Sequence, residues 1–216
     1  MTSALANPRG RAFGTLVAAI VTFGAVAAAH AEPGKPLALG AKAPQADTKL
    51  KNAAAPGEIT INKVTGAKGT LVVFTCNNCP FARAWEERIV ALGNTYSKKG
   101  IGVLLVNANN PNVSSTDTFE ATQARAKDRG MTFAYAVDPE GVVAKAFGAA
   151  KTPEAFLFDK SGALVYHGTV DDNHEEPAKV SKTYLKDALE AVSAGQKPAL
   201  QETKSLGCGI KYPKLS

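Results

Sequence analysis

Two apolar runs flank an amphipathic stretch near the middle of the chain. Residues 71–74 and residues 101–106 are apolar at both odd and even positions, as expected of strands that are covered on both faces of a sheet. Between them, large apolar residues recur at steps of three and four, the spacing of one helix face: Phe81, Trp85, Ile89, Leu92 and Tyr96. A strand, a helix and a further strand predict parallel pairing with a right-handed crossover.

The pattern on either side of this unit predicts shorter elements. Before it, a weak strand over 46–50, a turn at 55–57 and a strand over 58–63 indicate a hairpin, because apolar and polar residues alternate around a Pro-Gly pair. After it, a helix over 116–129 with Ser114 or Ser115 as its cap precedes a strand over 133–137 and a short helix that ends at Gly148.

The C-terminal part of the domain predicts a second hairpin and a final helix. A strand over 151–159 turns at 160–162 into a strand over 163–169, so these two strands are antiparallel. Apolar residues at helical spacing over 180–193 predict the last helix. The elements together predict an α/β fold, with a mixed central sheet and helices on both faces.

Residues 1–31 have the features of an export signal. Arg9 and Arg11 precede an apolar stretch rich in Ala and Gly, and the tripeptide 29–31 matches a small-residue cleavage site. The stretch is of borderline length for a membrane span, but its composition and the site at its end favour cleavage. We therefore expect a periplasmic or secreted protein with no stable membrane span after cleavage.

The rest of the chain divides into a lead-in over 32–42, one domain over 43–195 and a C-terminal tail over 196–216. The whole chain carries a net charge of +6, and without the expected signal +4. Basic residues are interleaved with acidic ones, so the sequence lacks the basic patch that binding to nucleic acid requires.

Two cysteines follow the first apolar run at C-x-x-C spacing, where the predicted helix begins. We place Cys76 at the helix mouth, where unpaired N–H groups and the helix dipole favour a thiolate, and Cys79 one turn further in. One thiol of such a pair attacks a partner's disulfide and the other resolves the mixed disulfide. The spacing therefore predicts electron exchange with protein disulfides or dithiols.

A zinc site or a structural disulfide has the same spacing. Zinc needs four ligands, and the other candidates, Cys208, His167 and His174, are far apart in the sequence. We expect no metal and no cofactor, whereas a structural disulfide remains an open alternative.

The dipeptide Thr152-Pro153 stands at the start of an apolar strand. A proline there removes a donor from the sheet ladder, which fits the start of an edge strand. It also fits a cis peptide bond, because an X-Pro bond adopts the cis form at modest cost.

The order of elements, anchored by Cys76, Cys79 and Thr152-Pro153, resembles the thioredoxin fold. The extra strand and helix between 107 and 148 and the leading segment 40–44 are similar to its peroxiredoxin-like branch. That branch includes the alkyl hydroperoxide reductase/thiol-specific antioxidant (AhpC/TSA) proteins and the periplasmic thioredoxins of cytochrome maturation.

The resemblance implies a thiol–disulfide oxidoreductase with antioxidant relatives and a role for each anchor. Cys76 is then the attacking thiolate and Cys79 the resolving thiol. Pro153 is a cis-proline that faces the pair, and Thr152 offers its backbone to an extended partner segment by β-augmentation. The substrates are protein disulfides or dithiols, with an unidentified redox partner.

Two departures leave the direction of electron flow and the reaction type open. Thioredoxins usually have Trp before the first cysteine and Gly-Pro between the two, where this chain has Thr75 and Asn77-Asn78. One alternative is a thiol peroxidase, for which Thr75 with Arg83 or Arg88 is an imperfect match. The other is a non-enzymatic module that binds copper or a partner protein, copper requiring two cysteines and a distal histidine.

Cys208 is left over, between two glycines in the tail. It is either a small apolar residue packed against the domain or a third redox thiol. Our hypothesis is that the tail folds back over the C-x-x-C end of the sheet and that Cys208 exchanges with Cys76 or Cys79. The glycines permit that close approach.

The remaining ionisable candidates are two histidines and two glutamates, which we expect to lie at the surface or, for His167, in a polar pocket. His167 is placed toward solvent or a polar pocket, and His174 in a solvated acidic loop over 171–176. Glu86 and Glu87 are assigned to the solvated face of the helix. The sequence does not identify the buried acid that thioredoxins use near the inner cysteine.

Overall fold

The computed structural model describes Met1 and residues 35–213. The predicted export signal therefore lies outside the described residues. Within the described part, no helix is long and apolar enough to cross a membrane.

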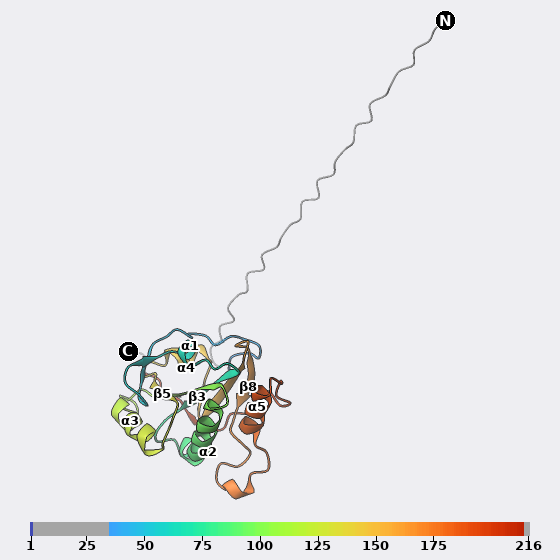
Figure 1. The fold of residues 1–216 in the computed structure, drawn as a ribbon. Helices are drawn as coiled ribbons and strands as arrows, with labels where there is room; N and C mark the ends of the chain where they lie inside the picture. Colours follow the sequence, from blue (N-terminus) through green and yellow to red (C-terminus); the bar gives the residue numbers. More distant parts are fainter. Residues whose placement is uncertain (2–34, 214–216) are drawn as a thin grey trace.

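Seven strands form one twisted sheet in the order β2-β1-β5-β4-β3-β7-β8 (Figure 1). The pairs β3/β4 and β4/β5 are parallel and the other neighbours are antiparallel, which confirms the expected mixed sheet. The strands are β1 Leu50–Asn52, β2 Glu58–Ile59, β3 Gly69–Thr75, β4 Ile101–Asn107, β5 Ala134–Val137, β7 Glu154–Asp159 and β8 Leu164–Gly168. A separate two-stranded ladder joins β6 Lys151–Thr152 to β9 Cys208–Gly209.

Helices cover both faces of this sheet. In Figure 1, α2, α3 and α5 lie below the strands and α1 and α4 lie above them. The helices are α1 Ile61–Val64, α2 Pro80–Ser97, α3 Phe119–Asp128, α4 Val142–Ala146 and α5 Tyr184–Ser193, with a 3₁₀ turn at Pro177–Lys179.

The central strand β3 contributes side chains to two hydrophobic cores, one on each face of the sheet. Leu71 and Val73 pack with Trp85 beneath the sheet, whereas Val72 and Phe74 pack above it. Phe74 meets Phe147 edge to face, with 5.2 Å between ring centroids. Every residue of β3 is buried, and this explains why the sequence shows no alternation there.

Three local expectations need correction. The first strand begins at Leu50, because the residues before it form turns. The second strand ends at Ile59, because the Thr60 hydroxyl accepts a hydrogen bond from Lys63 N and so caps α1. Thr118, rather than Ser114 or Ser115, caps α3 through the backbone N–H of Ala121.

The segment expected to be a loose lead-in packs on the sheet where the structure describes it. Leu37 is buried in the upper core, and its N–H donates to the Phe147 carbonyl at 2.9 Å. The tail is also packed, as described below. Residues 35–42 and 196–213 therefore belong to the folded unit.

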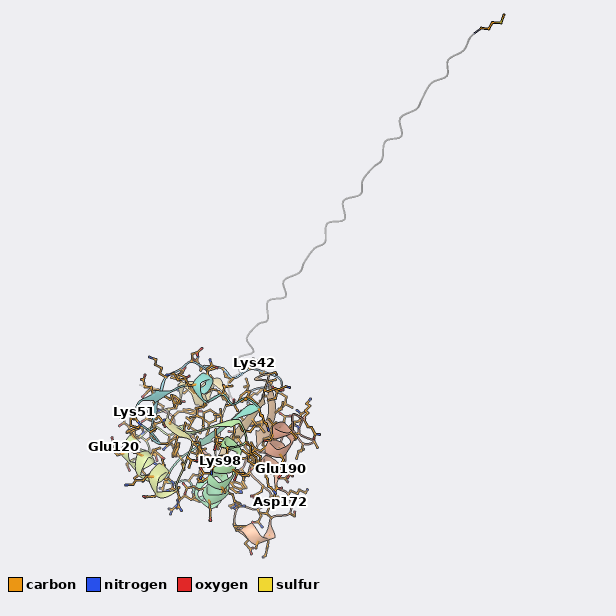
Figure 2. The ribbon with its side chains drawn as sticks, in the orientation of Figure 1. Lys42, Lys51, Lys98, Glu120, Asp172 and Glu190 are labelled. Carbon is orange, nitrogen blue, oxygen red and sulfur yellow. The ribbon has the colours of Figure 1, made fainter. Side chains whose placement is uncertain are left out.

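Charged side chains lie around the outside of the domain (Figure 2). The labelled examples carry both signs and are all exposed: Lys42, Lys51, Lys98, Glu120, Asp172 and Glu190. This distribution agrees with the interleaved charges of the sequence.

Candidate active site

The two cysteines occupy the connection from β3 to α2. Cys76 follows the last residue of β3, and Cys79 is the N-cap residue of α2. Pro80 occupies the first helical position, where its missing N–H costs no intrahelical hydrogen bond. The expectation that Cys76 stands at the helix mouth is therefore wrong, and Cys79 holds that place. Both side chains are buried free thiols.

The Thr152–Pro153 peptide bond is cis, as the resemblance implies. It links β6 to β7, and β7 pairs with β3 on one side and β8 on the other, so the edge-strand explanation for the proline is wrong. The Thr152 hydroxyl lies 3.3 Å from Cys76 Sγ. The thiol of Cys79 donates to the Thr152 carbonyl at 3.0 Å. Thr152 thus contacts both sulfur atoms.

The two thiols differ in acidity. Hydrogen bonding with the Cys76 thiol lowers the pKa of Cys79 to about 4, and a hydrogen bond with the Cys208 thiol adds to this while burial opposes it. The same hydrogen bond raises the pKa of Cys76, and burial and the nearby charge of Asp117 raise it further. The mutual hydrogen bond thus makes Cys79 the more acidic of the two thiols.

A buried polar network holds Asn77, the first of the two residues between the cysteines. The backbone N–H of Asn77 donates to Asp117 at 2.6 Å, and its side-chain amide donates to the Thr116 carbonyl and the Thr122 hydroxyl. The Tyr135 hydroxyl donates to Asn77 Oδ1 at 3.2 Å. Asn77 is thus anchored by hydrogen bonds to the 116–117 loop, to α3 and to β5.

A second buried acid lies behind the cis-proline. Glu154 Oε2 accepts hydrogen bonds from the backbone N–H groups of Ala150 and Lys151, while Oε1 lies 2.7 Å from His167 Nε2. Burial alone raises the pKa of Glu154, but hydrogen bonds from His167 and the backbone outweigh it and lower the pKa. His167 therefore faces this buried pocket and does not face solvent.

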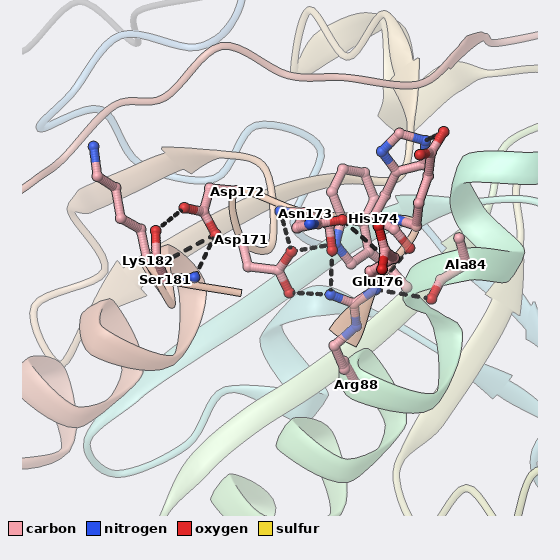
Figure 3. A network of polar contacts seen from close by, with 11 residues as sticks. Ala84, Arg88, Asp171, Asp172, Asn173, His174, Glu176, Ser181 and Lys182 are labelled. Carbon is pink, nitrogen blue, oxygen red and sulfur yellow. Dashed lines mark hydrogen bonds and ion pairs between the residues drawn. The ribbon is translucent and has the colours of Figure 1, made fainter. Parts of the chain in front are cut away.

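The loop over 171–176 is anchored to α2 and is not simply solvated. Asp171 is buried and accepts hydrogen bonds from Trp85 Nε1 at 2.7 Å and Arg88 at 2.5 Å, while Arg88 also donates to loop carbonyls (Figure 3). The His174 ring lies 4.6 Å from the Phe81 ring, between centroids. The loop thus packs on the first turns of the cysteine helix.

Other predicted residues lie elsewhere in the structure. Glu86 is largely buried and bridges Arg125 and Arg129, so its assignment to a solvated face is wrong, whereas Glu87 is exposed. Arg88, one of the arginines considered for peroxide chemistry, is bound to the loop, and Arg83 is exposed. In the described part of the chain, no three His, Cys, Asp or Glu side chains gather as metal ligands would.

The tail brings the third cysteine to the site. Cys208 packs against the cluster of Cys76, Cys79 and Ala82, and β9 pairs with β6. The expected fold-back of the tail over the C-x-x-C end is confirmed. The site therefore contains all three cysteines of the chain with Thr152 and Pro153.

The polar networks were not predicted from the sequence. Asp117 is buried with Asn107 and Asn109, both of which donate to it, and a signal for this did exist: polar residues directly after a buried parallel strand. Glu154 and Asp171 gave no such signal, because their side-chain partners come from distant segments.

Comparison with known sequences identifies one family. The sequence model of the AhpC/TSA family matches residues 39–167, which include Cys76, Cys79, Thr152 and Pro153. No curated protein gave a match.

Solved structures agree with this match. An uncharacterized conserved protein from Geobacillus kaustophilus is 30% identical, with a TM-score of 0.77 over 83% of this chain and 94% of that one. A hypothetical protein from Sinorhizobium meliloti is 32% identical, with a TM-score of 0.75 over 82% and 96%. A thioredoxin-like protein in its oxidized form is 20% identical, with a TM-score of 0.53 over 65% and 88%. The expected thioredoxin-like fold is confirmed.

Proposed function

This chain belongs to the AhpC/TSA family of thiol-dependent oxidoreductases, and from this premise we propose that it exchanges electrons with protein disulfides through Cys76 and Cys79. The observation that carries the proposal is the meeting of both thiols with the cis Thr152–Pro153 bond at the start of α2. That arrangement provides one thiol of lowered pKa, a second thiol beside it and a short strand next to both.

The exchange proceeds in two displacements. A thiolate of the pair attacks one sulfur of the partner's disulfide, and the other partner sulfur leaves as a thiolate. The second thiol of the pair then loses its proton and attacks the bound sulfur. A Cys76–Cys79 disulfide forms, and the partner departs as a dithiol that has gained two electrons. The reverse sequence oxidises a partner dithiol.

One of the two cysteines attacks the partner's disulfide, and the other resolves the mixed disulfide. The resemblance implies attack by Cys76, whereas the structure places the lower pKa on Cys79. We keep attack by Cys76 as the proposal, because Cys79 already has Cys208 as a neighbour on the side of β6. The attack requires that the Cys76 proton first pass to Cys79, through the hydrogen bond that joins the two thiols. We also place the activity outside the cytosol, on the basis of the export signal predicted for residues 1–31.

A peroxidase would need a positive charge beside the reacting sulfur. Three of the four arginines in the described chain are paired with carboxylates, Arg88 with Asp171 and the other two with Glu86. The fourth, Arg83, has an exposed side chain. We therefore propose exchange with disulfides ahead of peroxide reduction, and the engagement of these arginines in ion pairs supports that choice.

Two parallel assays test the proposal. We expect the protein to accelerate thiol–disulfide exchange with insulin, in glutathione buffers that favour reduction or oxidation, by about a hundredfold or more over the Cys76→Ser/Cys79→Ser double variant. We expect consumption of hydrogen peroxide to stay at the level of that variant. Cysteine-dependent peroxide consumption without exchange on insulin would contradict the proposal and support a peroxidase.

A further inference from the structure

The tail is tied to the domain on both sides of Cys208. Upstream, the His167 N–H donates to the Gln201 carbonyl at 2.8 Å, and the Ser205 hydroxyl donates to buried Glu154 at 3.0 Å. Downstream, the Lys211 N–H donates to Asn109 Oδ1 at 2.8 Å. These contacts hold the segment between them across the thiols.

Within that segment, β9 forms an antiparallel ladder with β6. Cys208 stands opposite Thr152, and Gly209 stands opposite Lys151. The short strand before the cis-proline is the edge to which the resemblance assigns an extended partner segment. In this structure the chain's own tail occupies that edge.

A glycine permits the close approach of the two strands. A Cβ atom on Gly207 would lie 2.3 Å from the Thr152 carbonyl oxygen, a distance that backbone atoms do not tolerate. A Cβ atom on Gly209 would have no atom within 4 Å. The two glycines that flank Cys208 therefore differ in what they do: only Gly207 is needed for the seating of β9.

The thiol of Cys208 reaches Cys79. Burial raises the pKa of Cys208 to about 11, and its hydrogen bond to Cys79 contributes to that rise. The same hydrogen bond helps to lower the pKa of Cys79. Cys208 also packs against the cluster that contains Cys79, and its backbone pairs with Thr152, the residue that contacts Cys79 Sγ.

We propose that Cys208 is a third redox thiol and that β9 is an internal substrate strand, seated where a partner's cysteine-containing segment binds. This inference rests on the proposed function, because that function supplies the Cys76–Cys79 disulfide. In the oxidised protein, the Cys208 thiol loses its proton and attacks Cys79 Sγ. The Cys79–Cys208 bond forms, the Cys76–Cys79 bond breaks, and Cys76 leaves as a thiolate that can take up the proton. No net oxidation occurs.

This exchange has a consequence for turnover. It frees the Cys76 thiolate to attack a second partner disulfide, while the first disulfide is retained within the chain as the Cys79–Cys208 bond. It also means that a partner segment must displace β9 from β6 before it can pair with Thr152. The tail then regulates access as well as storing the disulfide.

The test is the disulfide that forms when Cys76 is absent. Trypsin leaves Cys76 and Cys79 together on peptide 69–83 and Cys208 on peptide 205–211. A Cys76→Ser variant of the full chain is incubated with oxidised glutathione, alkylated and digested with trypsin without reduction. The masses of its peptides are then measured by mass spectrometry. We expect peptide 69–83 to be joined to 205–211, because the neighbouring thiol, at an effective concentration in about the millimolar range, displaces glutathione from Cys79.

The two glycines provide a matched pair of second variants. In the Cys76→Ser background, Gly207→Ala is expected to reduce the bridged fraction about tenfold, because the added Cβ pushes β9 away from Thr152. Gly209→Ala is expected to leave that fraction unchanged. In the wild-type background, Gly207→Ala is expected to accelerate exchange with insulin, since the edge of β6 is then open.

Distinct results overturn the two proposals. If Cys76→Ser carries only glutathione on Cys79, or if Gly207→Ala and Gly209→Ala bridge equally well, the role of Cys208 and β9 is refuted. Exchange on insulin by the wild-type protein shows in that case that the proposed function stands. Failure of wild-type protein to form the Cys76–Cys79 disulfide refutes the proposed function itself.

Discussion

Replacing Cys79 by serine is expected to reduce exchange with a protein disulfide by about a hundredfold or more and to leave the partner attached to Cys76. The second displacement needs a sulfur nucleophile next to Cys76, and Cys79 is the thiol that shares a hydrogen bond with it. A serine at the N-cap position also suits the helix start, so the variant is expected to fold. Non-reducing gels and mass spectrometry of the trapped complex measure the result.

The matched variant is Cys76→Ser, which is expected to lose turnover equally but to trap far less partner. Its Cys79 thiol has Cys208 as an internal partner, which displaces a bound segment. Trapping through Cys79 and not through Cys76 would reverse the two roles. Full exchange activity of either variant would refute exchange by this pair, because one of its two thiols would then be dispensable.

Replacing Glu154 by glutamine is expected to lower the free energy of unfolding by about 2–3 kcal/mol, because its carboxylate accepts hydrogen bonds inside the protein and an amide nitrogen cannot accept them. The carboxylate joins the backbone before the cis-proline to His167 and to Ser205 of the tail. Chemical denaturation measures the loss. Glu202→Gln, an exposed change in the same tail, is the control and is expected to have a much smaller effect.

The pH dependence of this loss gives an independent check. The pKa of Glu154 is lower in the folded protein than its ordinary value of 4.5. Its charge therefore stabilises the fold fully above pH 4.5, and the contribution disappears as the pH falls through the lowered folded-state pKa. The difference in stability between wild type and Glu154→Gln is expected to shrink on acidification. A difference that grows at low pH would contradict the assignment.

The sequence was most informative where structure depends on local pattern. The apolar runs of β3 and β4 and the helical spacing from Phe81 to Tyr96 fix the central βαβ unit, because each pattern reports burial on known faces. Thr152-Pro153 was recognisable as a cis bond only with the resemblance added, since an edge strand explained the proline equally well.

The sequence was least informative at element boundaries and in buried polar groups. Pro80 at the first position of α2 makes Cys79 the N-cap residue, three residues beyond the helix start expected from the sequence. The burial of Glu154 and Asp171 depends on partners many residues away, His167 for one and Arg88 for the other. No local pattern carries that information.

The measurement that tests the central claim most directly is the redox equilibrium of the Cys76–Cys79 pair in glutathione buffers, read from the mass of peptide 69–83. We predict a two-electron transition with a midpoint between about −270 mV, the value for a reductant such as thioredoxin, and about −120 mV, the value for a strong oxidant. The transition should persist in Cys208→Ser. A pair that forms no disulfide, or that stays oxidised at every accessible potential, would contradict the account and leave a structural role for the two cysteines.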